Sequence, residues 1–280
     1  MTNPFYGIVN NGIFGSPTVS QGQLLRPFPQ FTDLTDAQNI GSDTWFNALQ
    51  TTVKKRMSRG IEFEASYVWS KSIDLGEGAM QSHYRPDVER SVSSRDTPHR
   101  LVGSYLYELP FGRNRYLLRQ LPNIVESVVG GWQFNGIVTI QSGQALSITG
   151  SNTAGTFGQI EYANNNGQSG ALSGPAEDRL NRWFNTSVFT QPDPYTFGNL
   201  SPRVANIRGD YMNNFDQSLF KEFHPAGEWL NIQFRAEALN AFNHVQFANP
   251  NTTVTSGSFG RVTAQGNTPR QVQFGLKFLW

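Results

Sequence analysis

Five charged residues are spaced so that their side chains could act together. They occupy alternate positions in stretches of alternating polarity: Glu62, Glu64, Arg235, Glu237 and Lys277. Alternate residues of an extended strand share one face, so each stretch is predicted to carry its charges on a polar face. The charges could form a path for a charged substrate, or a ladder of ion pairs between neighbouring strands. We favour the ladder, because opposite charges on adjacent strands commonly pair.

The remaining residues do not indicate another kind of chemistry. The sequence contains no cysteine, which excludes thiol catalysis, disulfides and zinc-thiolate sites. The histidines His83, His99, His224 and His244 lack metal-ligand spacing, so we expect no metal site. No nucleophile elbow, Ser/His/Asp order or phosphate-binding glycine loop is visible, so we expect no catalytic residues, no cofactor and no enzyme. A net charge of +1 gives no general attraction to nucleic acid.

Aromatic residues stand in the longest stretch without periodicity, which runs from 147 to 212: Trp183, Phe184, Phe189 and Tyr195. Rings exposed in such a loop could contact a sugar or a peptide. They could instead pack the loop against itself. We favour packing, but all of them remain candidate ligand contacts.

The last stretch, 270–280, has the clearest pattern. Val272, Phe274, Leu276, Phe278 and Trp280 alternate mainly with polar residues, which predicts a β-strand with one apolar and one polar face. In a transmembrane barrel, one face of a strand meets lipid, the other lines a wet lumen, and aromatic rings gather at the interface. The pattern therefore favours a membrane barrel over a soluble β-domain.

The same alternation predicts further strands at 44–56, 61–72, 101–109, 132–140, 215–223 and 230–238. A short helix is expected after Pro122, closed by Gly130 and Gly131. Residues 1–43 are interpreted as a loop-rich amino-terminal segment, with a short strand near Phe5 to Val9. The mean hydropathy is −0.43, and no apolar run reaches the length of a membrane-spanning helix. The fold class is therefore all-β, and residues 44–280 supply the barrel strands.

The connections between these strands differ in length at the two ends of the predicted sheet. If the carboxyl terminus is periplasmic, the short turns at 58–60 and 224–227 are periplasmic, and the long connections at 73–98, 147–213 and 243–269 are extracellular. Outer-membrane barrels show this asymmetry, and only the 111–131 connection departs from it. The sequence therefore predicts an antiparallel transmembrane β-barrel segment in the bacterial outer membrane, with long extracellular loops.

The predicted strands do not complete a barrel. About seven or eight are expected, whereas a single-chain bacterial barrel closes with an even number of at least eight. The first residues also lack the basic segment and apolar core of a secretory signal. We therefore expect a partial barrel, the carboxyl part of a longer protein with its export signal upstream.

Several short segments resemble those of Oar-like TonB-dependent receptors, which are outer-membrane transporters. The segments are Trp45 to Gln50, Ala65 to Asp74, Arg95 to Arg100, Leu109 to Gly112, Gly131 to Gln133, Arg182 to Asn185, Arg235 to Glu237, Asn240 to His244 and Gln273 to Lys277. Each is weak alone, but in this order they cover nearly the whole chain. The chain resembles the last third of such a receptor.

The resemblance implies a large barrel, of about 22 strands, closed by an internal plug. It also implies that an inner-membrane TonB complex supplies energy through an amino-terminal box, so that this chain meets the complex only through the missing plug. Phe274, Leu276, Phe278 and Trp280 resemble the terminal signal read by the barrel-assembly machinery. The other expected partners are outer-membrane lipid and an unknown small-molecule, sugar or peptide substrate. Two alternatives remain: a small self-contained barrel acting as adhesin or pore, and a soluble carbohydrate-binding β-domain.

Overall fold

The computed structural model describes residues 1–10, 12–31, 43–75, 80–82, 85–113, 115–153, 160–225 and 229–280. Long strands form most of the described chain. They are β1 (Thr44–Ser58), β2 (Ile61–Leu75), β4 (His99–Glu108), β5 (Trp132–Gln141), β10 (Met212–Phe223), β11 (Asn231–Leu239) and β12 (Gln271–Leu279). Shorter strands are β3 (Arg90–Val92), β6 (Ala145–Leu146), β7 (Asn164–Asn165), β8 (Phe189–Thr190) and β9 (Val204–Arg208). The helices are η1 (Gly12–Gly15), α1 (Gln21–Leu24), η2 (Pro86–Glu89), α2 (Asn123–Val129), η3 (Glu177–Arg179) and η4 (Thr186–Val188).

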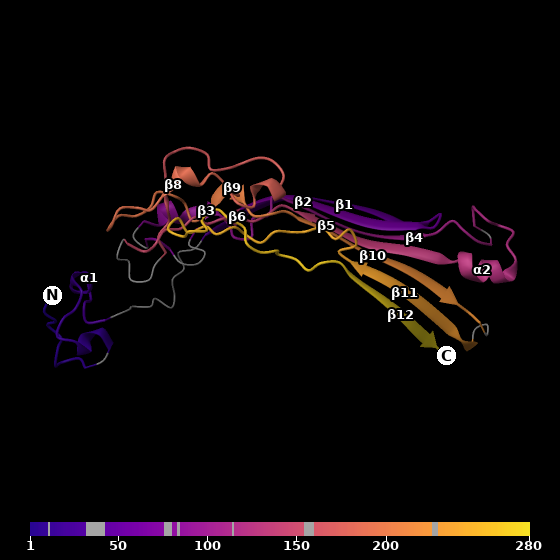
Figure 1. Cartoon of the computed structure of the whole chain (residues 1–280), viewed down its shortest axis with the longest axis horizontal. Coiled ribbons are helices and arrows are strands. Elements are labelled where there is room, and N and C mark those ends of the chain that lie inside the picture. The colour runs from indigo at the N-terminus through magenta and orange to yellow at the C-terminus, as the bar shows by residue number, and fades with distance from the viewer. Residues whose placement is uncertain are drawn as a thin grey trace.

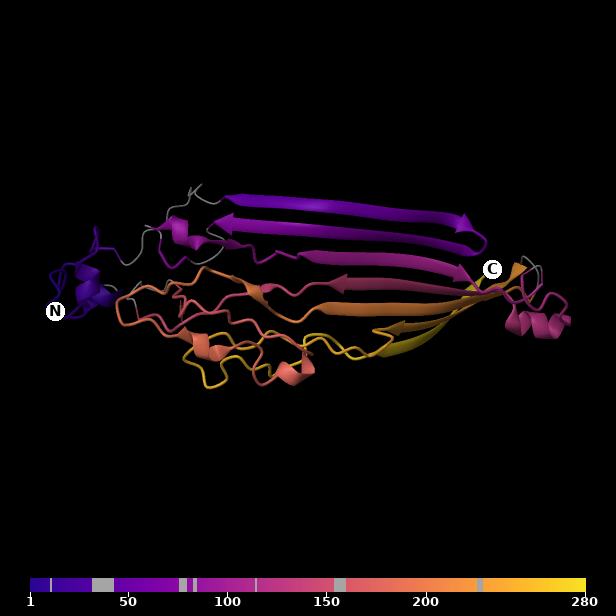
Figure 2. The same ribbon diagram turned by 90° about the horizontal axis from the view of Figure 1, so that it is seen from above.

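The long strands make one antiparallel sheet in the order β1-β2-β4-β5-β10-β11-β12, with β3 added beside β2. They lie side by side along the long axis of the molecule (Figures 1 and 2). The tight turn between β1 and β2 uses Arg59 and Gly60 at positive φ, 54° and 78°. Glycine adopts a positive φ without steric cost, which allows such a short turn between the two strands. All the long strands predicted from alternation are confirmed, with small differences at their ends.

The two ends of the sheet differ. One end, here called the hairpin end, carries the β1–β2 turn, α2 and the β10–β11 turn, of which residues 226–228 lie outside the described part (Figure 1). The other end, here called the loop end, carries the long connections before β4, β10 and β12. The sorting of short and long connections predicted from the sequence is therefore confirmed. The helix expected after Pro122 is also confirmed as α2.

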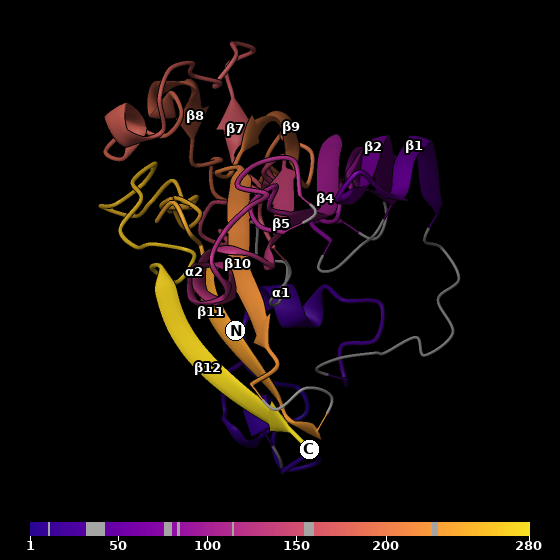
Figure 3. The ribbon, with the colours of Figure 1, turned by 90° about the vertical axis from the view of Figure 1, so that its right-hand side faces the viewer.

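The sheet is curved but open. β1 and β12 are its two edge strands, and over the described residues neither pairs with the other (Figure 3). The curve resembles a strip of barrel wall. No helix in the described ranges is long and apolar enough to cross a membrane.

The amino-terminal segment corrects one prediction, because no strand forms near Phe5 to Val9. The side chain of Asn3 donates hydrogen bonds to the carbonyls of Phe14 and Ser16, both at 2.8 Å, and accepts one from the Phe5 amide. These contacts fold residues 3–9 into turns instead of an extended strand. Residues 32–42 of this segment lie outside the described part of the chain.

The long connections at the loop end are more ordered than predicted. The stretch 147–211, expected to be loop, contains β7, β8 and β9 and two short helices. It also supplies most of a hydrophobic core, here called the outer core: Leu146, Ile148, Ala163, Trp183, Phe184, Val188, Phe189 and Ile207. This part of the chain therefore packs as a small compact unit at the loop end of the sheet.

Candidate functional site

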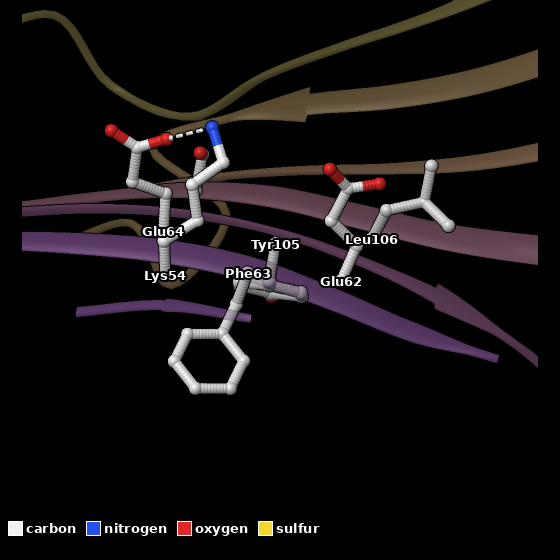
Figure 4. Close-up of a pocket in the computed structure, with 7 residues that line it drawn as sticks. Lys54, Glu62, Phe63, Glu64, Tyr105 and Leu106 are labelled. Carbon is white, nitrogen blue, oxygen red and sulfur yellow. Dashed lines mark hydrogen bonds and ion pairs between the residues drawn. The ribbon is translucent and has the colours of Figure 1, made fainter. Parts of the chain in front are cut away.

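The predicted charged residues of β2 lie on one face of the sheet. Glu62 and Glu64 project to the same side of the ribbon as Lys54, whereas Phe63 projects to the opposite side (Figure 4). Register pairs Lys54 with Glu64, and the Lys54 ammonium lies 2.9 Å from the Glu64 carboxylate. This is the cross-strand ion pair expected of a ladder.

The other predicted charges share that face but form a second group on β11 and β12. The amide of Gln273 donates to the Glu237 carboxylate across the two strands. Arg235 donates to Gln233 at 2.7 Å, and its guanidinium lies 5.2 Å from the ring centroid of Phe220. Lys277 is the register partner of Gln233. These contacts are pairs between neighbours, as in the ladder interpretation.

Register relates the two groups. Glu62 and Glu237 stand in one row that crosses β2, β4, β5, β10 and β11, with Leu106, Asn135 and Ser218 between them. At about 4.8 Å between strands, the two carboxylates are separated by roughly 20 Å. The row is charged at both ends and neutral in the middle. It does not form a continuous charged track.

A shallow hollow of about 220 Å³ lies at the first charged group. Its wall includes Lys54, Glu62, Glu64, Ser104 and Leu106 from β1, β2 and β4, with Phe63 and Tyr105 beside them (Figure 4). Such a hollow suits water and small ions better than a large substrate. It is a feature of the polar face rather than a closed binding site.

The opposite face of the sheet is apolar. On β12 it carries Phe274, Leu276 and Phe278, which are 73%, 61% and 51% exposed. Leu276 pairs with Phe234, whose ring also stacks on Phe274 with centroids 6.4 Å apart. Trp280 follows the end of β12 and is 92% exposed. Apolar side chains left bare over a whole face indicate contact with an apolar solvent or partner.

One glycine on this apolar face has a specific packing role. The Tyr105 ring crosses β5 over Gly136, and its hydroxyl donates to Gln217 on β10, in a contact that joins three strands. A Cβ on Gly136 would lie 2.5 Å from that ring. Gly136 therefore makes room for the tyrosine, and the hydrogen bond satisfies a polar amide on the apolar face.

The aromatic residues predicted as ligand contacts are divided by the structure. Trp183, Phe184 and Phe189 are buried in the outer core, where Phe184 packs edge-on against Phe189 at 5.9 Å. For these three the prediction of ligand contact is wrong, because packing against one another removes them from the surface. Tyr195 is 86% exposed and remains a candidate.

A buried ion pair that the sequence did not reveal joins the outer core to the sheet. The Asp96 carboxylate is fully buried, lies 2.6 Å from the Arg208 guanidinium and accepts the Ser72 amide at 2.7 Å. The Arg208 carbonyl accepts the indole N–H of Trp183 at 2.7 Å. The pair therefore connects β2, the segment before β4, β9 and the outer core. No periodicity marks either residue, and they are 112 positions apart.

A second buried carboxylate lies in the same region. Glu89, 1% exposed, accepts the Ser82 amide at 2.9 Å and the Tyr162 hydroxyl at 3.2 Å. Burial of Tyr162 raises the pKa of its phenol above the ordinary value, and the nearby negative charge of Glu89 raises it further. The hydroxyl therefore stays protonated and acts as a donor.

A polar cavity of about 300 Å³ lies where β5 and β10 reach the loop end. Its wall includes Gln141, Gln144, Gln246 and Asn249, together with the apolar side chains of Met212 and Phe247 among others. Asp210, also in the wall, accepts the Phe247 amide at 2.8 Å. Amide groups beside apolar surface can hydrogen-bond a neutral polar ligand.

No set of three or more metal-binding side chains gathers anywhere in the described ranges. Of the four histidines, His83 lies outside those ranges, and His224 is exposed directly after β10. His99 contacts the hydroxyl of Tyr67 at 2.8 Å, and His244 packs against the ring of Tyr211.

The comparisons with known proteins agree with this geometry. Residues 4–273 match the model of the outer membrane beta barrel domain, which is nearly the whole chain. No curated protein and no solved structure matches the chain. The match overturns the soluble carbohydrate-binding alternative. The chain belongs to the outer membrane beta barrel domain family and is located in the bacterial outer membrane.

Proposed function

We propose that the chain is the carboxyl-terminal barrel portion of a TonB-dependent outer-membrane receptor, which takes up a substrate with energy from the inner membrane. The open sheet carries this proposal. β1 and β12 are unpaired edges, and backbone groups at an open edge cannot be left facing hydrocarbon. Further strands must therefore complete the wall, and a larger barrel of this kind has room for a plug.

The charged and polar face fits the wet interior of such a barrel. Glu62, Glu64, Arg235, Glu237 and Lys277 line this interior, where neighbouring pairs stabilise the wall. The cavity between Gln141 and Gln246 and the exposed Tyr195 lie at the loop end, where a small molecule, sugar or peptide would arrive. Phe274, Leu276, Phe278 and Trp280 present β12 to the barrel-assembly machinery and afterwards to lipid.

In this proposal the chain has no catalytic role and does not transport by itself. The plug would block and open the barrel, and only through the plug would the TonB complex act. The alternative of a small closed adhesin or pore needs an eighth long strand from residues 1–43. Their described part, 1–10, 12–31 and 43, forms turns and short helices instead.

Reconstitution tests the proposal directly. The 280-residue chain would be assembled into lipid vesicles and planar bilayers, beside the protein encoded by the complete reading frame. We expect only the complete protein to fold into a heat-resistant barrel and to bind the periplasmic domain of TonB. A stable, ion-conducting barrel formed by the 280 residues alone would refute it and favour the small pore.

A further inference from the structure

The connection between β4 and β5, residues 109–131, leaves apolar side chains bare at the hairpin end. Ile124 and Val128 on α2 are 82% and 62% exposed, and Tyr116 in the same connection is 78% exposed. A helix of seven residues has little stability of its own in water. Its apolar side therefore requires a covering surface.

Two hydrogen bonds attach α2 to the apolar face of the sheet. The indole N–H of Trp132 donates to the carbonyl of Val128 at 2.9 Å, and the Lys221 ammonium donates to the carbonyl of Gly130. Trp132 and Lys221 are register partners on the apolar side of β5 and β10. In the end-on view α2 lies outside the curve of the strands (Figure 3). The exposed side of α2 therefore continues the surface that meets lipid.

The charge of the connection fits a phospholipid surface. It contains Arg113, Arg115 and Arg119 against one acidic residue, Glu126, a net charge of three minus one, or +2. Arg115 is paired with Glu108 at 2.5 Å, and Glu126 accepts the backbone amide of Arg113 at 2.7 Å. Arg119 donates to a backbone carbonyl and lies 6.0 Å from the Tyr116 ring centroid. Its guanidinium is exposed beside an aromatic ring, as in interfacial membrane anchors.

We propose that residues 109–131 form an interfacial anchor in the periplasmic leaflet of the outer membrane. Ile124, Val125 and Val128 enter the acyl region, Tyr116 lies at the headgroup level, and Arg119 contacts phospholipid phosphates. The anchor explains why the connection at this end is long when the neighbouring connections are short. The inference rests on outer-membrane location and on the proposed periplasmic position of the hairpin end, not on uptake.

Site-directed fluorescence tests the anchor, since the chain has no cysteine of its own. Val128→Cys and the matched control Ser127→Cys would be labelled with an environment-sensitive dye in the intact protein. The protein would be reconstituted with phosphatidylethanolamine and phosphatidylglycerol. Quenching by aqueous iodide and by spin-labelled lipid is measured for each. Phe274→Cys, on the apolar face of β12, reports insertion of the barrel itself.

The anchor predicts blue-shifted emission at position 128, strong quenching by spin-labelled lipid and severalfold weaker quenching by iodide than at 127. Arg119→Gln should increase iodide quenching at 128. Equal iodide quenching at 127 and 128, with position 274 quenched by lipid, overturns the anchor while leaving the barrel intact. Protection of 128 in native membranes but not in pure lipid would identify a protein partner and also overturn it.

Discussion

Replacing Leu276 by arginine tests which face of β12 meets lipid. Leu276 lies one residue from the middle of β12 and points from the apolar face, where it pairs with Phe234. An arginine on the lipid face near the bilayer midplane costs about 2 to 4 kcal/mol. Since 1.4 kcal/mol is a factor of ten, the ratio of folded to unfolded protein should fall by roughly 30- to 700-fold.

Two further arginine substitutions on the same strand serve as matched controls. Gln273→Arg introduces the same side chain on the polar face, beside the carboxylate of Glu237, and should change stability by less than about 1 kcal/mol. Phe278→Arg places an arginine on the same apolar face as Leu276→Arg, but nearer the hairpin end. There the free-energy cost should fall to about 1 kcal/mol or less. The three variants separate the effect of face from the effect of depth.

The assay is urea-dependent folding of the intact protein into lipid vesicles, followed by tryptophan fluorescence and by heat-dependent migration in gels. The expected order of destabilisation is Leu276→Arg first, Phe278→Arg second and Gln273→Arg last. Equal losses for Leu276→Arg and Gln273→Arg would refute the assignment of the two faces. A larger loss of stability for Gln273→Arg than for Leu276→Arg would show that the two faces are assigned the wrong way round.

Three other predictions concern single contacts. Asp96→Asn should cost about 3 kcal/mol by removing the buried carboxylate that pairs with Arg208, and limited proteolysis should then cut the outer loops sooner. Arg208→Ala should cost less, because Lys71 still lies 3.8 Å from the Asp96 carboxylate. Tyr162 has a higher phenol pKa in the folded protein than the value near 10 expected in the unfolded chain. Its contribution to stability is therefore complete below that unfolded pKa and is lost as the pH rises through the folded pKa. Protease resistance of the outer core should therefore fall above about pH 10, and Tyr162→Phe should flatten that fall. Gly136→Ala should cost about 1 to 3 kcal/mol in urea titrations, and Tyr105→Ala in the same chain should recover part of the loss.

The sheet could be predicted from the sequence because a strand between lipid and water alternates strictly. β5 and β12 show it well, with most of their large apolar residues on one face and glutamine, asparagine or lysine on the other, although Ile137 and Leu279 lie on the polar face. Hydrogen bonding between neighbouring strands then follows from short turns such as Arg59-Gly60. The face of each charged candidate was predictable for the same reason. The pairing of Lys54 with Glu64 was not, because it depends on register.

The loop end could not be predicted in the same way. Trp183, Phe184 and Phe189 pack together through irregular turns and very short strands, so no period of two or 3.6 residues marks them. Asp96 and Arg208 meet only after the strands between them have paired. For the aromatic residues and for the ion pair alike, the local composition predicts a loop. Their buried contacts depend on residues distant in the sequence, which a local pattern does not show. The favoured interpretation, that the rings pack the loop on itself, is confirmed for these three residues.

The sheet and the outer core obey opposite rules of burial. Every residue of β12 is exposed, including large apolar side chains, whereas Phe184 and Ile148 of the outer core are at most 1% exposed. Apolar residues gather inward only where the surroundings are water. The change of rule falls near the start of β4, where the buried Asp96 carboxylate pairs with Arg208. We expect these charges to lie beyond the hydrocarbon, where they can fix the loops to the wall without entering lipid.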